Sequence, residues 1–212
     1  MVPKTQTRSM IAEDEHPHSS TSDAAELGTM RAAGKRLSAQ LDWLPGASSN
    51  TFSERCRKIA VTFKGLFAGV DAAFAKAPGS EDLLWLRDNA QQLSSEVRAV
   101  AADLGPLTNI PHAATQQEIL PRVLAIAQAF FDETDATFSE ANFTEFCLSF
   151  EDAVPLDFHE VGALVPALKL VLLEKIAALG VRLLNDPTSK PAQRMNGRPE
   201  GKSRQTIDRL PG

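Results

Sequence analysis

The chain has 212 residues, of which 43% are hydrophobic and 23% charged, a balance typical of a soluble protein with one or two domains. Its net charge of -5 is unevenly spread: residues 51–185 carry 11 basic and 18 acidic groups, whereas residues 186–212 carry 6 and 3. Proteins that bind nucleic acid need a basic face to displace counterions from the phosphates. An acidic body therefore excludes that class, and we predict no nucleic-acid partner.

Residues 1–26 mix Pro, Ser, Thr, His and acidic residues without periodicity, which predicts a disordered N-terminal tail. The pair His16 and His18 in this tail is interpreted as solvated rather than as a metal site. Residues 27–51 are expected to form a short helix and a linker, the helical pattern covering 24–44 and ending in a Pro-Gly turn.

Residues 52–184 repeat apolar side chains at intervals of three and four, the spacing of amphipathic helices, so we predict one helical bundle domain here. Ser80 is placed to cap one of its helices, and another is expected to open at Ser139. Pro121 is expected in the first turn of the third helix, where its missing N–H costs little. The predicted helices cover 52–77, 80–104, a segment from about 119, a segment from 139 and 157–180, with an extended linker at 107–115.

The last predicted helix organises the domain. Asp157 and Glu160 have the spacing of a capping box. The run 161–179 is apolar on most faces, and such a helix belongs in the middle of a bundle, with Leu168 and Leu172 on one buried face. The predicted fold class is therefore all-α, a bundle of about five helices without a sheet, between disordered N- and C-terminal tails, the latter being the basic segment 185–212.

Cys56 and Cys147 stand far from each other and from any zinc-like Cys/His spacing, which predicts buried free thiols in a reducing compartment. No apolar segment near the N-terminus has the form of a secretory signal. The longest apolar run, 161–173, contains Pro166 and Lys169 and is shorter than the ~20 residues that span a membrane. We therefore predict a cytoplasmic chain without a transmembrane segment.

No constellation of residues predicts catalysis. The acidic group at 132–135 lacks the Gly and Glu of an EF-hand loop, and His159 has no nucleophile partner in a recognisable pattern. No glycine-rich phosphate cradle occurs. Glu160 and Glu174 border an apolar helix and are expected to cap it or to pair with Lys or Arg of a neighbouring helix. We predict no catalytic residue, no metal, no cofactor and no enzymatic activity for the chain by itself.

Two stretches resemble the N-terminal region of the cyclic β-1,2-glucan synthases. The first begins with Trp85-Leu86-Arg87-Asp88-Asn89, which fits a W-L-x-D-N start followed by an amphipathic helix and a Leu-Pro linker. The second runs from Leu120-Pro121-Arg122-Val123 into 155–176, where the family reads roughly P-L-x-x-x-E-L-W-A-h-P-h-x-L-R-L-x-L-h-E-N-L. The chain departs from that pattern at Gly162 (Trp in the family), Pro166 (one place late), Lys169 (Arg) and Lys175 (Asn).

The residues singled out as interaction or structural candidates are those that the resemblance and the helix pattern share: Trp85, Asp88, Asn89, Pro155, Glu160, Lys169 and Glu174. Members of the family are large bacterial inner-membrane glycosyltransferases fused to a glycoside-phosphorylase-like module. They elongate β-1,2-linked glucose chains from UDP-glucose and cyclise them. None of the family's catalytic motifs occurs in this chain.

The resemblance implies a non-catalytic N-terminal helical domain, or a truncated fragment, with a structural or interaction role in a glucan-synthesising glycosyltransferase system. Its implied partners are a membrane glycosyltransferase module or a second copy of the chain, and its implied place is peripheral to the bacterial inner membrane. The alternative is a stand-alone helical module that binds an unknown protein.

Overall fold

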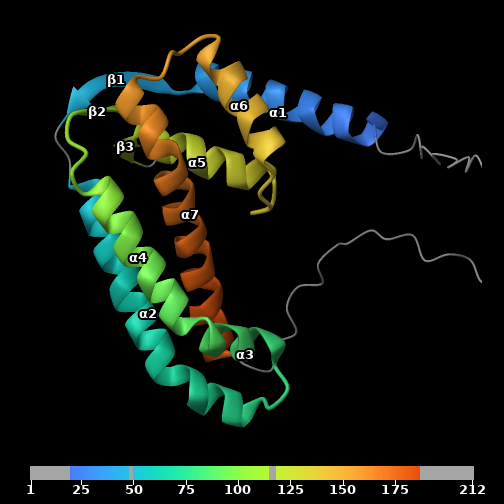
Figure 1. Ribbon diagram of the computed structural model, residues 1–212, viewed down its shortest axis with the longest axis vertical. Coiled ribbons are helices and arrows are strands. Elements are labelled where there is room, and N and C mark those ends of the chain that lie inside the picture. Colours follow the sequence, from blue (N-terminus) through green and yellow to red (C-terminus); the bar gives the residue numbers. More distant parts are fainter. Residues whose placement is uncertain (1–19, 48–49, 115–117, 187–212) are drawn as a thin grey trace, which may run out of the picture.

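The computed structural model describes residues 20–47, 50–114 and 118–186, which are mainly helical (Figure 1). In chain order the described elements are α1 (Ser20–Gln40), β1 (Asp42–Ala47), α2 (Thr51–Lys76), α3 (Glu81–Asp88), α4 (Ala90–Leu104), β2 (Ile110–Ala114), β3 (Ile119–Pro121), α5 (Arg122–Glu133), α6 (Glu140–Glu151) and α7 (Phe158–Asn185).

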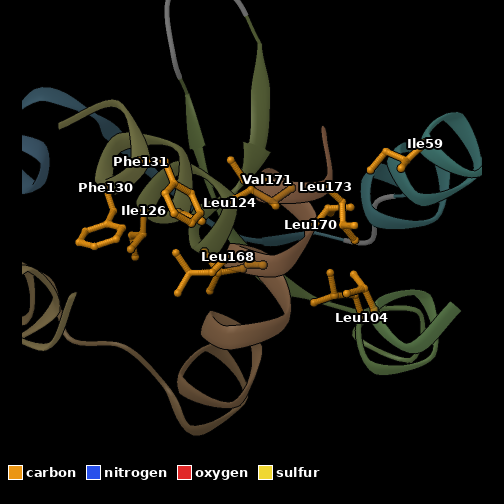
Figure 2. Packing of buried hydrophobic residues seen from close by; sticks show 14 of the residues in the cluster. Ile59, Leu104, Leu124, Ile126, Phe130, Phe131, Leu168, Leu170, Val171 and Leu173 are labelled. Atoms are coloured by element: carbon orange, nitrogen blue, oxygen red, sulfur yellow. The ribbon is translucent and has the colours of Figure 1, made fainter. Parts of the chain in front are cut away.

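Helix α7 lies at the centre of the fold, between α2 and α4 on one side and α5 on the other (Figure 1). It starts where the sequence predicted, because Asp157 and Glu160 form both hydrogen bonds of a capping box. Figure 2 shows that Leu168 extends toward α5, whereas Leu170 and Leu173 extend toward α2 and α4. One helix therefore supplies the apolar surface on which both halves of the core are built.

A second packing unit is the pair α1 and α6, which lie side by side at one end of the molecule (Figure 1). The two helices come close at Gly34, where an added Cβ would meet the carbonyl oxygen of Phe146 and the hydroxyl of Ser149. Met30 and Leu37 of α1 belong to the same buried cluster as the side chains around α7. Helix α1 is therefore part of the core, although it begins inside the segment 1–26 that was predicted to be a tail.

The prediction of a fold without a sheet is wrong. Strands β1, β2 and β3 form a small antiparallel sheet in that order. The register of β1 and β2 shifts between Leu44 and Ala47, where the backbone of Gly46 comes so close to Asn109 that a side chain would clash. The strands are three to six residues long, each contains Pro, and β1 also contains Gly, so they lack the alternation from which a strand is predicted.

Two helix boundaries also differ from prediction. The segment 80–104 is two helices, because Asn89 ends α3, with its side-chain amide donating to the carbonyl of Trp85 at 2.8 Å, and precedes α4. Helix α5 begins at Arg122, since Ile119–Pro121 are paired in the sheet and Pro121 serves as the N-cap. Six helices, α2 to α7, thus stand where five were predicted, and α1 overlaps the short helix predicted at 24–44.

Several local predictions are confirmed. The side chains of Ser80 and Ser139 accept hydrogen bonds at the starts of α3 and α6. Cys56 and Cys147 are buried free thiols. Leu168 is buried as predicted, but Leu172 is only partly buried and lies at the edge of the core. Of the predicted tails 1–26 and 185–212, residues 20–26 belong to α1 and residue 185 ends α7, whereas 1–19 and 187–212 lie outside the described part of the chain.

Candidate functional site

Glu160, the most deeply buried polar side chain of the described residues, forms an ion pair at the start of α7. Arg122, the first residue of α5, donates from Nε to Oε1 of Glu160 at 2.6 Å and from Nη2 to the other carboxylate oxygen. The side chain of Glu160 has no exposed surface. Arg122 also donates to the carbonyl of Pro155 at 3.1 Å. Charges buried in this way are tolerated only when they are paired and hydrogen-bonded, as both are here.

This ion pair connects four elements. The second oxygen of Glu160 also accepts from the backbone N–H of Asp157 at 3.0 Å. The guanidinium of Arg122 lies 5.8 Å from the centre of the Trp43 ring, which packs edge-on against Phe150. Strand β1, α5, α6 and the cap of α7 therefore meet at one point, and the carboxylate of Glu160 is engaged by donors on every side rather than open to a substrate.

His112 of β2 is buried close to the same region, opposite Leu44 of β1 and Pro121 of β3. Neither of its ring nitrogens has a hydrogen-bond partner among the described residues. No sequence signal distinguished this histidine from an ordinary residue of an extended linker, because both its burial and its position depend on the pairing of three distant strands.

Glu174, in the middle of α7, makes the second bidentate ion pair. Its two carboxylate oxygens accept from Nε and Nη2 of Arg55 at 2.7 and 2.6 Å. The hydrogen bond to Glu174 is the largest cause of a raised pKa of Arg55, and the charge of Glu118 adds to it. Both carboxylates singled out in the sequence thus pair with an arginine of another helix, as predicted.

A polar cleft of about 950 Å³ opens beside Glu174, between the end of α1, the sheet, α5 and α7. Its polar lining is Gln40, Asp42, Glu118, Gln128, Asp132, Glu174 and Lys175, and its apolar lining is Leu41, Ala114, Leu120 and Val171. Lys175 donates to Asp132 at 2.9 Å across this lining. Elements that are far apart in sequence build the cleft, so no short motif could predict it.

The other candidate residues lie apart from the cleft. Trp85 is 48% exposed on α3, and Asp88 is also exposed, 3.4 Å from Arg87. Lys169 reaches Glu96 of α4 at 3.0 Å on the surface. Together with Asn89 and Pro155, described above, these residues occupy caps, ion pairs and surface positions along α3, α4 and α7 and do not converge on one site.

The first turns of α7 expose an apolar stripe formed by Phe158, Val161 and Val165, whose side chains are 89%, 50% and 57% exposed. Their spacing of three and four residues places them on one face of the helix. Gly162 lies exposed between them, with open space where a side chain would stand. The sequence predicted this segment to be covered on all sides, because its apolar residues occupy most faces.

In the described part of the chain, no group of three or more His, Cys, Asp or Glu side chains is placed to hold a metal ion. None of the described helices combines the length and apolarity needed to cross a membrane.

With this geometry in place, comparison with known proteins finds a similarity to the cyclic beta-(1,2)-glucan synthase NdvB of Rhizobium meliloti (strain 1021). The match is 24% identical over 164 residues and takes in 74% of this chain but 6% of that protein. The chain thus spans a small part of its relative, and the identity indicates a relation at family level at most. No family model matches the chain, and no solved structure matches it.

Proposed function

We propose that this chain is a non-catalytic helical domain that binds the glycosyltransferase of a glucan-synthesising system. The observation that carries the proposal is the apolar stripe on α7, which lies within the segment whose residues resemble the cyclic β-1,2-glucan synthases. The similarity to one such synthase is the reason for proposing a glucan-synthesising system.

The proposed occupant of the stripe is the polypeptide of that transferase. In the relative, the matched region is joined to a chain many times longer, since the match covers 6% of it. A helix face that is left uncovered within the region is then available to the remainder of the protein. The family pattern also places large apolar residues, Leu and Trp, at the positions of Val161 and Gly162, both of which are exposed here.

The residues that resemble the family support a scaffolding role. Glu160 holds Arg122 in the core, and Glu174 holds Arg55 across two helices. The departure Lys169 keeps a positive charge and pairs with Glu96. These contacts fix the position and orientation of α7 relative to α2, α4 and α5. A rigid helix that presents an exposed stripe loses little conformational entropy on docking, which favours association.

Site-specific photo-crosslinking tests the proposal and detects even a weak complex. A photoreactive amino acid replaces Val165, or Val61 of α2 as the control, since Val61 is 65% exposed and lies outside the stripe. Each variant is produced together with the β-1,2-glucan-synthesising transferase of the same genome. We expect crosslinks to the transferase from position 165 and none from position 61. Crosslinks from 165 to an unrelated protein alone would support the stand-alone binding module instead.

Point variants separate docking from folding. Phe158→Asp and Val161→Asp place a charge on the stripe and leave position 165 free for the photoreactive amino acid, whereas Val61→Asp places the same charge on α2. All three sites are exposed, so the free energy of unfolding obtained from thermal melts should change by less than about 0.5 kcal/mol. Loss of the crosslink in the α7 variants alone is expected, and equal crosslinking in all three contradicts the proposal. The non-catalytic part is tested by incubating purified chain with UDP-glucose: turnover that His159→Ala abolishes would overturn it.

A further inference from the structure

The cleft beside Glu174 has the dimensions of a small-molecule site and an unusually polar lining. Its volume of about 950 Å³ lies at the upper end of the ~300–1,000 Å³ typical of ligand pockets. Side chains from α1, β1, α5 and α7 converge on it, and Glu118 precedes β3. A site that draws on several separate elements keeps its shape as long as the fold does.

The charge of the lining limits the ligand. Four carboxylates and one ammonium group face the cleft, so a phosphate or a nucleoside diphosphate would meet net repulsion. Among the carboxylates, Glu174 is paired with Arg55, and Asp132 is paired with Lys175. A metal ion finds no cluster of three ligands among the described residues. A neutral ligand rich in hydrogen-bonding groups meets neither obstacle.

The polar groups suit a polyhydroxylated ligand. Gln40 and Gln128 each offer a carbonyl acceptor and an amide donor, and the carboxylates offer further lone pairs. The bidentate pair with Arg55 holds the carboxylate of Glu174 in one orientation, and Lys175 adds an ammonium donor to the same lining. Sugar hydroxyls both donate and accept, so they match such a mixed set of groups.

The apolar part of the lining completes the match. Leu41, Leu120 and Val171 lie among the polar groups of the cleft. A pyranose ring presents C–H groups on its faces and hydroxyls around its edge. It can therefore place a face on Leu41 and Ala114, the partly exposed apolar residues of the lining, since Leu120 and Val171 are buried, while its hydroxyls meet the glutamines and carboxylates.

We propose that this cleft binds a short segment of neutral glucan. The identification of the sugar as glucan rests on the proposed function, whereas the preference for a neutral polyol rests on the cleft. The domain would then hold the carbohydrate chain beside the transferase that it docks, with the cleft and the stripe occupying different parts of α7.

Binding is measured by titrating isotope-labelled chain with linear β-1,2-linked gluco-oligosaccharides and following backbone amide shifts by NMR. UDP-glucose is the comparison ligand. We expect saturable shifts at residues of α5 and α7 that line the cleft, and none there with UDP-glucose. Gln128→Ala removes one neutral hydrogen bond, so it should weaken binding about two- to tenfold. Gln92→Ala, on the exposed surface of α4, is the matched control and should bind as the parent does.

The outcomes separate the two proposals. Absence of saturable shifts at millimolar oligosaccharide overturns the glucan site, as do equal affinities of Gln128→Ala and Gln92→Ala. Preferential binding of UDP-glucose in the cleft overturns it as well. Val161→Asp should leave oligosaccharide binding unchanged, and Gln128→Ala should leave the crosslink from position 165 unchanged. Failure of docking with intact glucan binding, or the reverse, therefore identifies which proposal is wrong.

Discussion

The buried pair of Arg122 and Glu160 should be the most sensitive polar contact of the fold. Glu160→Gln keeps the shape of the side chain but leaves the guanidinium of Arg122 buried without a counter-charge. Removing one partner of a buried ion pair costs roughly 3–5 kcal/mol. Domains of this size are usually stable by about 5–15 kcal/mol, so the variant should lose a large part of its free energy of unfolding.

The double variant Arg122→Met/Glu160→Leu tests the physical reason. It removes both charges and fills the space with apolar atoms, and such replacements are often neutral or stabilising. It also gives up the hydrogen bonds to Pro155 and Asp157, so we expect it to be less stable than the parent but clearly more stable than Glu160→Gln alone. The surface pair of Lys169 and Glu96 is the control, and Lys169→Ala should cost about 0–1 kcal/mol.

Urea melts followed by far-UV circular dichroism give these free energies. Trp43, which lies over Arg122, provides a local fluorescence signal once the exposed Trp85 is replaced by Phe. Two results would refute the reasoning: a cost for Glu160→Gln no larger than that for Lys169→Ala, or a double variant no more stable than Glu160→Gln. Either result would mean that the stability of the fold does not depend on Arg122 and Glu160 neutralising each other in the core.

Three further outcomes follow from the packing. Leu170→Ala should cost about 2–5 kcal/mol in a urea melt, whereas Leu148→Ala, at a side chain 55% exposed, should stay within about 0.5 kcal/mol. Gly34→Ala should separate α1 from α6, because the new methyl group would overlap the backbone of Phe146, and limited proteolysis should then cut α1 faster. Burial raises the pKa of the Cys147 thiol to about 12, so alkylation at about pH 8 should be slow until urea is added. An unfolded thiol ionises near pH 8.5, so the stability that Cys147 contributes is complete below that pH and is lost as the pH rises toward 12. Urea melts at a series of pH values should show this loss in the parent and not in Cys147→Ala. The same pH dependence in both proteins would contradict the raised pKa of Cys147.

Local signals in the sequence predicted local features of the fold. The caps at Ser80 and Ser139 and the capping box of α7 each involve residues within one helical turn, so their spacing alone specifies the contact. The expectation that Glu160 would find an arginine or lysine was also correct. The identity of that partner was not predictable, because Arg122 is 38 residues away and meets Glu160 only after α5 and α7 have packed.

The sheet shows the same limit more strongly. Asp42 pairs with Ala114, and Ala114 pairs in turn with Ile119. Strand β2 therefore lies between β3, which follows it closely in sequence, and β1, which is separated from it by α2, α3 and α4. Each strand is too short to carry a period, and its hydrogen bonds depend on where the helices bring it. The cleft lies against the same sheet, at Asp42 and Ala114, and was missed for the same reason.

The apolar sequence of α7 predicted that other helices cover it on all sides, but in the structure part of its surface is exposed to solvent. Fully burying a side chain such as Val or Phe gains about 1.5–3 kcal/mol, so three partly exposed ones offer roughly 3–6 kcal/mol to a partner. Association of two free proteins costs about 4–15 kcal/mol in lost motion at the standard state. The stripe of Phe158, Val161 and Val165 is therefore too small to form a tight complex between separate chains by itself. It is sufficient when the partner is tethered nearby, because a short linker supplies a millimolar effective concentration. An interface of this size fits a domain that docks within a larger assembly, which is the setting of the matched region in its relative.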